Sequence, residues 1–198
     1  MEYRIILASK SPRRRELLEN IGLTFEVMVD NSPEYADKSM PPGEYVQKIA
    51  RVKLENVMRA VVDDEACGNL VIIAADTVVV FAGEILGKPE DKDDAFRMLK
   101  LLSRNTHEVY TGIAVLNPAD NGVITHAEMT RVTFRELSDE EIASYVNTGE
   151  PMDKAGSYGI QNLGSLLVSK IEGDFFNVVG LPLCKLGNIL SELGVSAI

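Results

Sequence analysis

The sequence predicts an α/β fold in which a mixed β-sheet is flanked by helices. Three observations support this class. The chain starts with an apolar strand-like segment that runs directly into a helix-like segment. Its middle holds apolar runs joined by short turns, which is typical of β-hairpins. Helical segments alternate with these strands, and no internal repeat or low-complexity linker interrupts them, so we expect a single domain over residues 1–198.

The first unit is a strand at "YRIILAS" followed by a helix from Pro12 to about Asn20. Ser11 has the N-cap position, Pro12 the first helical position, and Gly22 closes the helix. After "TFEVMV" comes a polar, proline-containing loop over residues 30–44, and "EYVQKIARVKLENVMRAVV" then takes up helical spacing.

The central part is predicted to be rich in strands. A long apolar strand over residues 69–86 turns back on itself at Ala82-Gly83. The segment 88–103 is a helix with acidic residues in its first turns, which suits the positive end of the helix dipole. Two β-rich strands, over residues 107–118 and 123–137, are joined by the turn "ADNG".

The C-terminal part begins with a capping box, because Ser138 is followed three residues later by Glu141. This pattern predicts a helix in "SDEEIASYVNTG". The glycine-rich stretch 149–164 is interpreted as loop, residues 165–179 return to strand and turn, and Pro182 opens a last helix.

Composition excludes several classes of protein. The formal net charge of −10 opposes non-specific binding to nucleic acid or to an anionic membrane, because both require a basic surface. Cys67 and Cys184 lie far apart without a CxxC spacing, which argues against a disulfide framework or a zinc site and fits a reducing cytoplasm. We find no signal peptide and no stretch approaching the ~20 apolar residues of a membrane span.

Asp76 is the most unusual residue, because "VIIAADTVVVF" surrounds its carboxylate with apolar strand residues. Burial of an unpaired charge is costly, so Asp76 needs a partner. It either caps a backbone amide at the strand end, or acts as a metal ligand or general base facing a cleft.

Other polar residues are ambiguous when taken singly. Lys88 and Lys53 could be surface residues, and Glu34 could be a solvated loop residue. Together with a carboxylate on a buried strand, however, they form the set of groups needed for magnesium-assisted chemistry on a phosphate chain.

Three consecutive arginines follow Ser11-Pro12, where cations oppose the helix dipole. Arg14 shares the inward stripe with the helix leucines, and Arg13 lies beside it, whereas Arg15 is spaced to pair with Glu19 on the surface. An inward arginine at a helix N-terminus suits an anion, with Ser9 and Ser11 as phosphate-contacting hydroxyls. The alternative is an arginine whose stem packs on the core while its head reaches water.

Six blocks resemble one family in order and spacing. They are "LASKSPRRRELL", "AADTVVV", "GKP", "THEVYTGIAV", "GEPMDKAGSYGIQ" and "GDFFNVVGLP". On these residues the chain is identified as a member of the Maf proteins, which are nucleoside triphosphate pyrophosphatases first named for septum formation. The P-loop, GxGxxG, HExxH and GxSxG signatures are all missing.

The resemblance implies an elongated mixed sheet split into two lobes by a cleft, similar to the inosine triphosphate pyrophosphatases. It implies cleavage between the α and β phosphates with a divalent metal, Mg²⁺ or Mn²⁺. Asp76 matches the proton acceptor and a metal ligand. The other implied site residues are Glu34 at the metal, Arg13, Thr77 and Gln161 for base choice, and Lys53, Lys88 and Lys154 near the substrate.

Base preference follows from fewer residues. "GEPMDKAGSYGIQ" resembles the branch acting on dTTP and UTP, and a Gln161 amide suits the carbonyl and imide N–H of uracil or thymine. Lys10, Asn162 and the stretch "LSRNTH" depart from the commoner family pattern. Hydrolysis of 7-methyl-GTP, and a non-catalytic role in regulating septum formation, stay open as alternatives. A homodimer is expected by resemblance alone.

Overall fold

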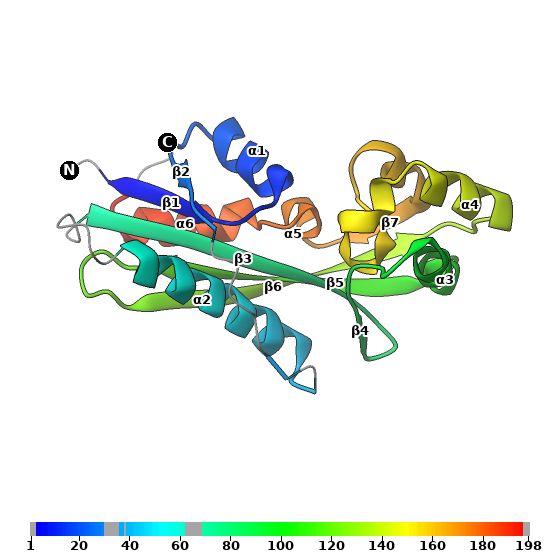
Figure 1. Cartoon of the computed structure of the whole chain (residues 1–198), viewed down its shortest axis with the longest axis horizontal. Coiled ribbons are helices and arrows are strands. Elements are labelled where there is room, and N and C mark those ends of the chain that lie inside the picture. Colours follow the sequence, from blue (N-terminus) through cyan, green and yellow to red (C-terminus); the bar gives the residue numbers. More distant parts are fainter. Residues whose placement is uncertain (1–2, 30–35, 38, 62–68, 196–198) are drawn as a thin grey trace. The chain divides into compact units, whose positions relative to one another are not determined.

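The computed structural model describes residues 3–29, 36–37, 39–61 and 69–195. Figure 1 shows strands and helices in the mixed order that the sequence predicts. The strands are β1 (Arg4–Ala8), β2 (Glu26–Val27), β3 (Leu70–Phe81), β4 (Glu84–Leu86), β5 (Thr106–Leu116), β6 (Val123–Phe134) and β7 (Val168–Glu172). The α-helices are α1 (Pro12–Asn20), α2 (Pro42–Val61), α3 (Lys92–Leu102), α4 (Asp139–Asn147), α5 (Phe175–Val179) and α6 (Leu183–Glu192).

The seven strands form one mixed sheet in the order β2-β1-β3-β5-β6-β7, with β4 paired to β3. β1 is parallel to both β2 and β3, whereas β4 and β7 pair antiparallel with their neighbours. The prediction of an α/β fold with a mixed sheet and flanking helices is therefore confirmed. None of the described helices combines the length and the apolar character that crossing a membrane requires.

Two predicted segments differ from the structure. The segment "TFEVMV", to which no element is assigned from the sequence, contributes the two-residue strand β2. The stretch 149–164 is not a plain loop, because it forms three 3₁₀ turns: η2 (Glu150–Asp153), η3 (Ala155–Ser157) and the first part of η4 (Asn162–Leu167). The turn predicted after β7 contains the short helix α5. Gly149 and Gly156 have positive φ angles, which explains why a glycine-rich sequence can wind into successive short turns.

The chain divides into two compact units. Unit 1 comprises residues 1–76, 111–128 and 180–198, and unit 2 comprises residues 77–110 and 129–179. Each of the long strands β3, β5 and β6 contributes one part to each unit. Whether the chain acts as one domain stays a prediction.

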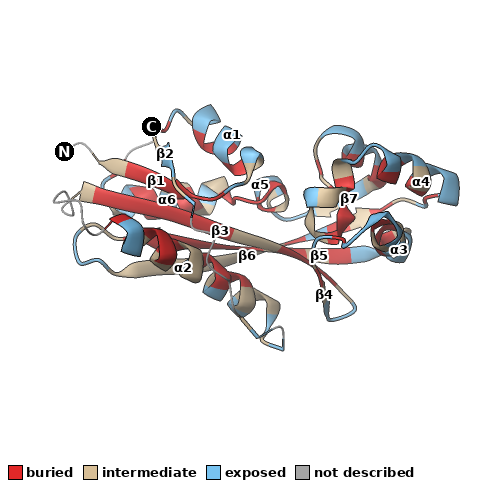
Figure 2. Ribbon diagram, in the orientation of Figure 1, coloured by how far each residue is buried: buried red, intermediate tan, exposed pale blue. Residues whose placement is uncertain are grey.

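Unit 1 is a sheet covered on both faces. Ile6, Ile72 and Ala74 pack with Ala50 and Leu54 of α2. In Figure 1, α1 and α6 lie on the other side of β1 and β3 from α2. Figure 2 shows that β1 and this part of β3 are buried almost throughout, as expected for parallel strands covered on both faces.

The contact between α2 and β5 is unusually close. A Cβ atom added to Gly112 would lie 2.3 Å from the carbonyl carbon of Val46 and 2.4 Å from its oxygen. These are backbone atoms of a helix, so they cannot rotate away as a side chain could. Gly112 therefore allows α2 to lie directly against the sheet, and this contact fixes the helix that carries Lys53.

Unit 2 has its own core. It includes side chains of α3, of α4 and of the unit 2 parts of the long strands, with Leu99, Phe134, Ile142 and Tyr158 among its buried members. The capping box predicted for α4 is confirmed, because the Ser138 and Glu141 side chains each accept from the backbone N–H of the other residue.

Candidate active site

The first arginine motif begins where β1 ends. β1 and β3 are in parallel register from Arg4 opposite Leu70 to Ala8 opposite Ala74. The chain leaving β1 at Ser9 therefore emerges beside Ala75 and Asp76. In open α/β sheets, ligands bind outside the carboxyl ends of the strands, and this loop lies at the carboxyl end of β1. Asp76 lies beside that end but in the middle of β3, not at a strand end as expected from the sequence.

Helix α1 starts as the sequence predicts. Ser11 is the N-cap, with its hydroxyl accepting from the backbone N–H of Arg14 at 3.5 Å, and Pro12 follows at the first helical position. Ser9 Oγ in turn accepts from the backbone N–H of Ser11 at 3.2 Å. Both predicted hydroxyls thus shape the loop that joins β1 to α1.

The three arginines separate as their spacing predicts. Arg15 is exposed and pairs with Glu19 at 2.8 Å. Arg13 is half-buried. Arg14 is buried, with 8% of its surface exposed, and its Nε donates to the Gly180 carbonyl at 2.7 Å.

The Nη1 group of Arg14 donates to the Ala75 carbonyl at 2.8 Å and to Ser9 Oγ at 3.2 Å. One guanidinium therefore ties α1, β3 and the segment before α6 together. The alternative from the sequence, in which the Arg14 guanidinium reaches water, is therefore wrong. The Ala75 carbonyl that accepts from Arg14 belongs to the residue directly before Asp76.

Asp76 has the partner that the sequence requires. Lys53 Nζ lies 2.7 Å from Asp76 Oδ1, and the two side chains are 20% and 18% exposed. Lys53 comes from α2, on the helix face that also packs against β3. The pair is thus largely shielded from bulk water but keeps some exposed surface, which a group that contacts a substrate needs.

The described carboxylates suit a metal ion that takes only one or two ligands from the protein. Among residues 3–29, 36–37, 39–61 and 69–195, no group of three or more His, Cys, Asp or Glu side chains is placed to hold an ion. Mg²⁺ commonly uses one or two protein carboxylates and takes its other ligands from phosphates and water. Asp76 suits that role, whereas Glu34, the second predicted ligand, lies outside the described residues.

Unit 2 carries the remaining predicted residues. Thr77 is half-buried at the start of the unit 2 part of β3, directly after Asp76, and Lys88 is exposed after β4. Gln161 is half-buried at the start of η4. Lys154 has 11% of its side chain exposed, and its ammonium lies 2.6 Å from Asp153 Oδ1. Lys154 is thus already engaged within its own turn.

Sequence reasoning missed a second set of polar residues in unit 2. Glu150 accepts hydrogen bonds from the Tyr145 hydroxyl and from the backbone N–H groups of Leu163 and Gly164. Nothing in the local pattern marks Glu150, because its partners lie up to 14 residues away along the chain. Its position inside the block shared with the Maf proteins was the only available signal.

His107 is a further buried polar residue that sequence reasoning left unassigned. Its Nε2 lies 2.8 Å from the Tyr158 hydroxyl, and its ring packs edge-on against Phe134 and Tyr158. Its Nδ1 has no hydrogen-bond partner among the described residues. Burial lowers the pKa of His107 to about 4, so the ring is neutral at physiological pH.

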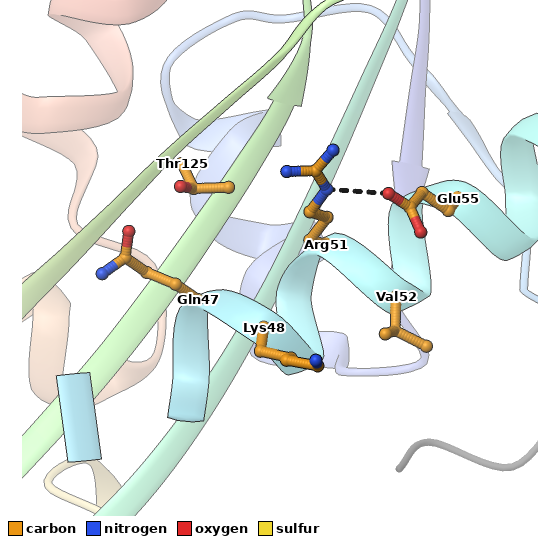
Figure 3. A pocket seen from close by; sticks show the side chains of 6 residues that line it. All are labelled: Gln47, Lys48, Arg51, Val52, Glu55 and Thr125. Atoms are coloured by element: carbon orange, nitrogen blue, oxygen red, sulfur yellow. Dashed lines mark hydrogen bonds and ion pairs between the residues drawn. The ribbon is translucent and has the colours of Figure 1, made fainter. Parts of the chain in front are cut away.

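A groove of about 450 Å³ lies elsewhere on unit 1, lined by α2 and by one residue of β6. Figure 3 shows its lining and the Arg51–Glu55 pair, which measures 2.7 Å. The lining residues are Gln47, Lys48, Arg51, Val52, Glu55 and Thr125. None of the residues predicted from the sequence to act in catalysis or binding lines it.

Comparisons with known proteins identify the family of the chain. The family model described as "Maf-like protein" matches residues 4–193. A protein of Acetivibrio thermocellus named "dTTP/UTP pyrophosphatase" is 48% identical over 196 residues, covering 98% of each chain. A protein of Alkaliphilus oremlandii with the same name is 50% identical over 186 residues, covering 94% of each chain.

The fold also has a match among solved structures. A HAM1 protein from Coxiella burnetii superposes with a TM-score of 0.55 at 13% identity, covering 96% of this chain and all of the other. At that identity the match concerns the fold alone.

Proposed function

The chain belongs to the Maf-like protein family, and on that premise we propose that it is a dTTP/UTP pyrophosphatase, an enzyme that hydrolyses these triphosphates to the nucleoside monophosphate and pyrophosphate. The observation that carries the proposal is the agreement of name among relatives that are 44–50% identical over nearly their whole length. The Lys53–Asp76 pair at the carboxyl end of β1 supports it, because hydrolysis needs a positioned proton acceptor.

Asp76 is the proton acceptor in this proposal. A water molecule attacks the α-phosphorus, its proton passes to the Asp76 carboxylate, and the bond from the α-phosphorus to the bridging oxygen breaks to release pyrophosphate. Lys53 holds Asp76 Oδ1 at 2.7 Å, which leaves Oδ2 to face the water. The rate gain comes mainly from positioning and electrostatics, as in other phosphoryl transfers.

A divalent cation, Mg²⁺ or Mn²⁺, would be held by Asp76 and Glu34 together with the substrate. When bound, it supplies charge stabilisation on the phosphate oxygens. Of the two predicted ligands only Asp76 lies among the described residues, and no group of three or more possible ligands is found there, which supports a cation that takes most of its ligands from the triphosphate and from water.

The cationic residues have two different roles. Arg13 and Lys88 offset the negative charge of the phosphates and of the leaving pyrophosphate. Arg14 acts differently, because its Nε and Nη1 donate to the Gly180 and Ala75 carbonyls. We assign Arg14 to positioning: it fixes the start of α1, and with it Arg13, beside Asp76.

Base choice is assigned to Gln161, with Thr77 and Arg13. The Gln161 amide donates and accepts at once, which matches the adjacent carbonyl and imide N–H of uracil and thymine. Lys10 and Asn162 are both exposed, so their unusual side chains could alter base preference without disturbing the core.

The test is pyrophosphate release from dTTP, UTP, CTP, GTP and 7-methyl-GTP, compared by kcat/KM. Asp76→Asn is expected to lower kcat by at least about 100-fold while nucleotide binding by calorimetry persists. Asp93→Asn, an exposed carboxylate on α3, is the matched control and should keep wild-type kcat.

The outcomes distinguish the competing functions. A preference for 7-methyl-GTP would reassign the substrate. Nucleotide binding without any pyrophosphate release would indicate a regulator of septum formation, and wild-type kcat in Asp76→Asn would refute the assigned mechanism.

Two further properties belong to the proposal. We expect a homodimer, which light scattering of the purified protein tests, and a cytoplasmic location, which fractionation of the source cells tests.

A further inference from the structure

Gln161 lies in a short loop whose two ends are fixed by the same pair of side chains. This loop, residues 159–164, is called the Gln161 loop below. At its start, the Gly159 N–H donates to the Tyr145 hydroxyl at 3.3 Å. At its end, the Gly164 N–H donates to Glu150 Oε1 at 3.1 Å. The Tyr145 hydroxyl in turn donates to the same Glu150 oxygen at 2.9 Å, which closes the ring of contacts.

The two ends of the loop also touch each other. A Cβ atom added to Gly164 would lie 2.0 Å from the Gly159 carbonyl oxygen and 2.7 Å from the Tyr145 hydroxyl oxygen. Only glycine fits there. The loop tip bends through Asn162, which has a φ of +54°. Gln161 is therefore presented from a narrow, closed turn rather than from an extended segment.

Glu150 suits these donors because an ionised carboxylate only accepts hydrogen bonds. Its other oxygen, Oε2, accepts from the Leu163 N–H at 3.4 Å. Tyr145 is 6% exposed within the core of unit 2, and burial raises its pKa, so its hydroxyl keeps its proton and donates to Glu150. The loop is thus anchored to helix α4 through a side chain that cannot move freely.

We propose that Glu150 and Tyr145 are positioning residues that set base selectivity, because they hold the loop that presents Gln161. The inference rests on the proposed function, in which Gln161 contacts the base. A glutamine held in one position recognises a base edge with both its donor and its acceptor. A loosened loop loses that discrimination, while the phosphate chemistry at Asp76 does not depend on it.

The experiment measures the ratio of kcat/KM for UTP to kcat/KM for GTP, two substrates with the same sugar. Glu150→Gln removes the negative charge and replaces one of the two acceptor oxygens by an NH2 donor, and Tyr145→Phe removes the hydroxyl alone. Each is expected to lower the ratio about 10-fold, the effect of losing one well-placed hydrogen bond. Glu136→Gln, an exposed carboxylate paired only on the surface, is the control and should leave the ratio unchanged.

A combined variant separates positioning from general destabilisation. Gln161→Ala should lower the ratio by itself, and Glu150→Gln added to it should lower the ratio no further, because the contact being positioned is already gone. Destabilisation alone would lower kcat/KM for UTP and for GTP by the same factor and would leave the ratio unchanged in both backgrounds. Amide hydrogen exchange should also become at least about 10-fold faster at Leu163 and Gly164 in Glu150→Gln.

The outcomes also separate this inference from the proposed function. If Gln161→Ala lowers the ratio but neither Glu150→Gln nor Tyr145→Phe does, the positioning role is wrong and the function stands. If Gln161→Ala leaves the ratio unchanged, the assigned role of Gln161 and this inference both fail. Absence of pyrophosphate release from every triphosphate refutes the proposed function itself.

Discussion

Lys53 Nζ lies 2.7 Å from Asp76 Oδ1, although the two residues are 23 positions apart and belong to a helix and a strand. The strand presents a carboxylate among apolar neighbours, and the helix brings its cation. Both side chains are about one fifth exposed. Charges in such surroundings interact more strongly than charges on the surface, because less water screens them.

The first prediction concerns this pair. A double-mutant cycle of Lys53→Met and Asp76→Asn should give a coupling of about 1 kcal/mol in the free energy of unfolding, measured by urea denaturation. The same cycle at Lys100 and Asp139, which also form an ion pair but are more than half exposed, should give about 0.5 kcal/mol or less. Equal coupling in the two cycles would show that burial does not strengthen the Lys53–Asp76 pair.

The second prediction contrasts two neighbouring arginines. Arg14→Lys should lower the free energy of unfolding by about 2–3 kcal/mol, because an ammonium cannot replace the planar fork that serves two carbonyls and a hydroxyl. Arg15→Lys should change it by less than about 0.5 kcal/mol, because Arg15 is exposed. Similar losses in both variants, measured by chemical denaturation, would contradict a buried structural role for Arg14.

The third prediction is a pH dependence of stability. Burial lowers the pKa of His107 to about 4, below its ordinary value of 6.5, so between these values the unfolded chain binds a proton that the folded chain excludes. Above about pH 6.5, His107 is neutral in both states and does not lower the free energy of unfolding. As the pH falls from 6.5 towards 4, the free energy of unfolding decreases by up to about 3 kcal/mol.

Urea denaturation from pH 4.5 to 7.5 tests this dependence. His107→Gln should flatten the dependence in that range. Tyr158→Phe keeps the buried imidazole and should retain the dependence, because burial and not the Tyr158 hydrogen bond causes the shift. An unchanged slope in His107→Gln would assign the effect to other groups.

The fourth prediction concerns the packing of α2. Gly112→Ala places a methyl group 2.3 Å from the Val46 backbone, so α2 must move away from the sheet, at a cost of about 3 kcal/mol or more. Because α2 carries Lys53, kcat for dTTP should fall as well. Gly187→Ala, on helix α6 with no atom within 4 Å of the added carbon, should raise stability by about 0.5–1 kcal/mol. A Gly112→Ala protein as stable as wild type would contradict the close contact.

Much of the fold follows from local patterns. Ser11 with Pro12, and Ser138 with Glu141, mark two helix starts correctly, because caps use hydrogen bonds to residues only a few positions away. Apolar runs and the Ala82-Gly83 turn likewise locate the β3 and β4 hairpin. The short 3₁₀ turns after α4 were not predicted, because their geometry depends on contacts with Glu150 and Gly87 that lie outside any local window.

By itself, the sequence determined which residue types are out of place: a carboxylate in an apolar strand, and arginines at the positive end of a helix. It also determined that such groups need partners, because burial of an unpaired charge is costly. Only the tertiary structure decided which partners they have. Lys53 reaches Asp76 from another helix, Arg14 turns to carbonyls and not to water, and Glu150 and Tyr145 close the Gln161 loop. Most of these contacts join residues 14 to 61 positions apart along the chain, and packing brings them within hydrogen-bond distance.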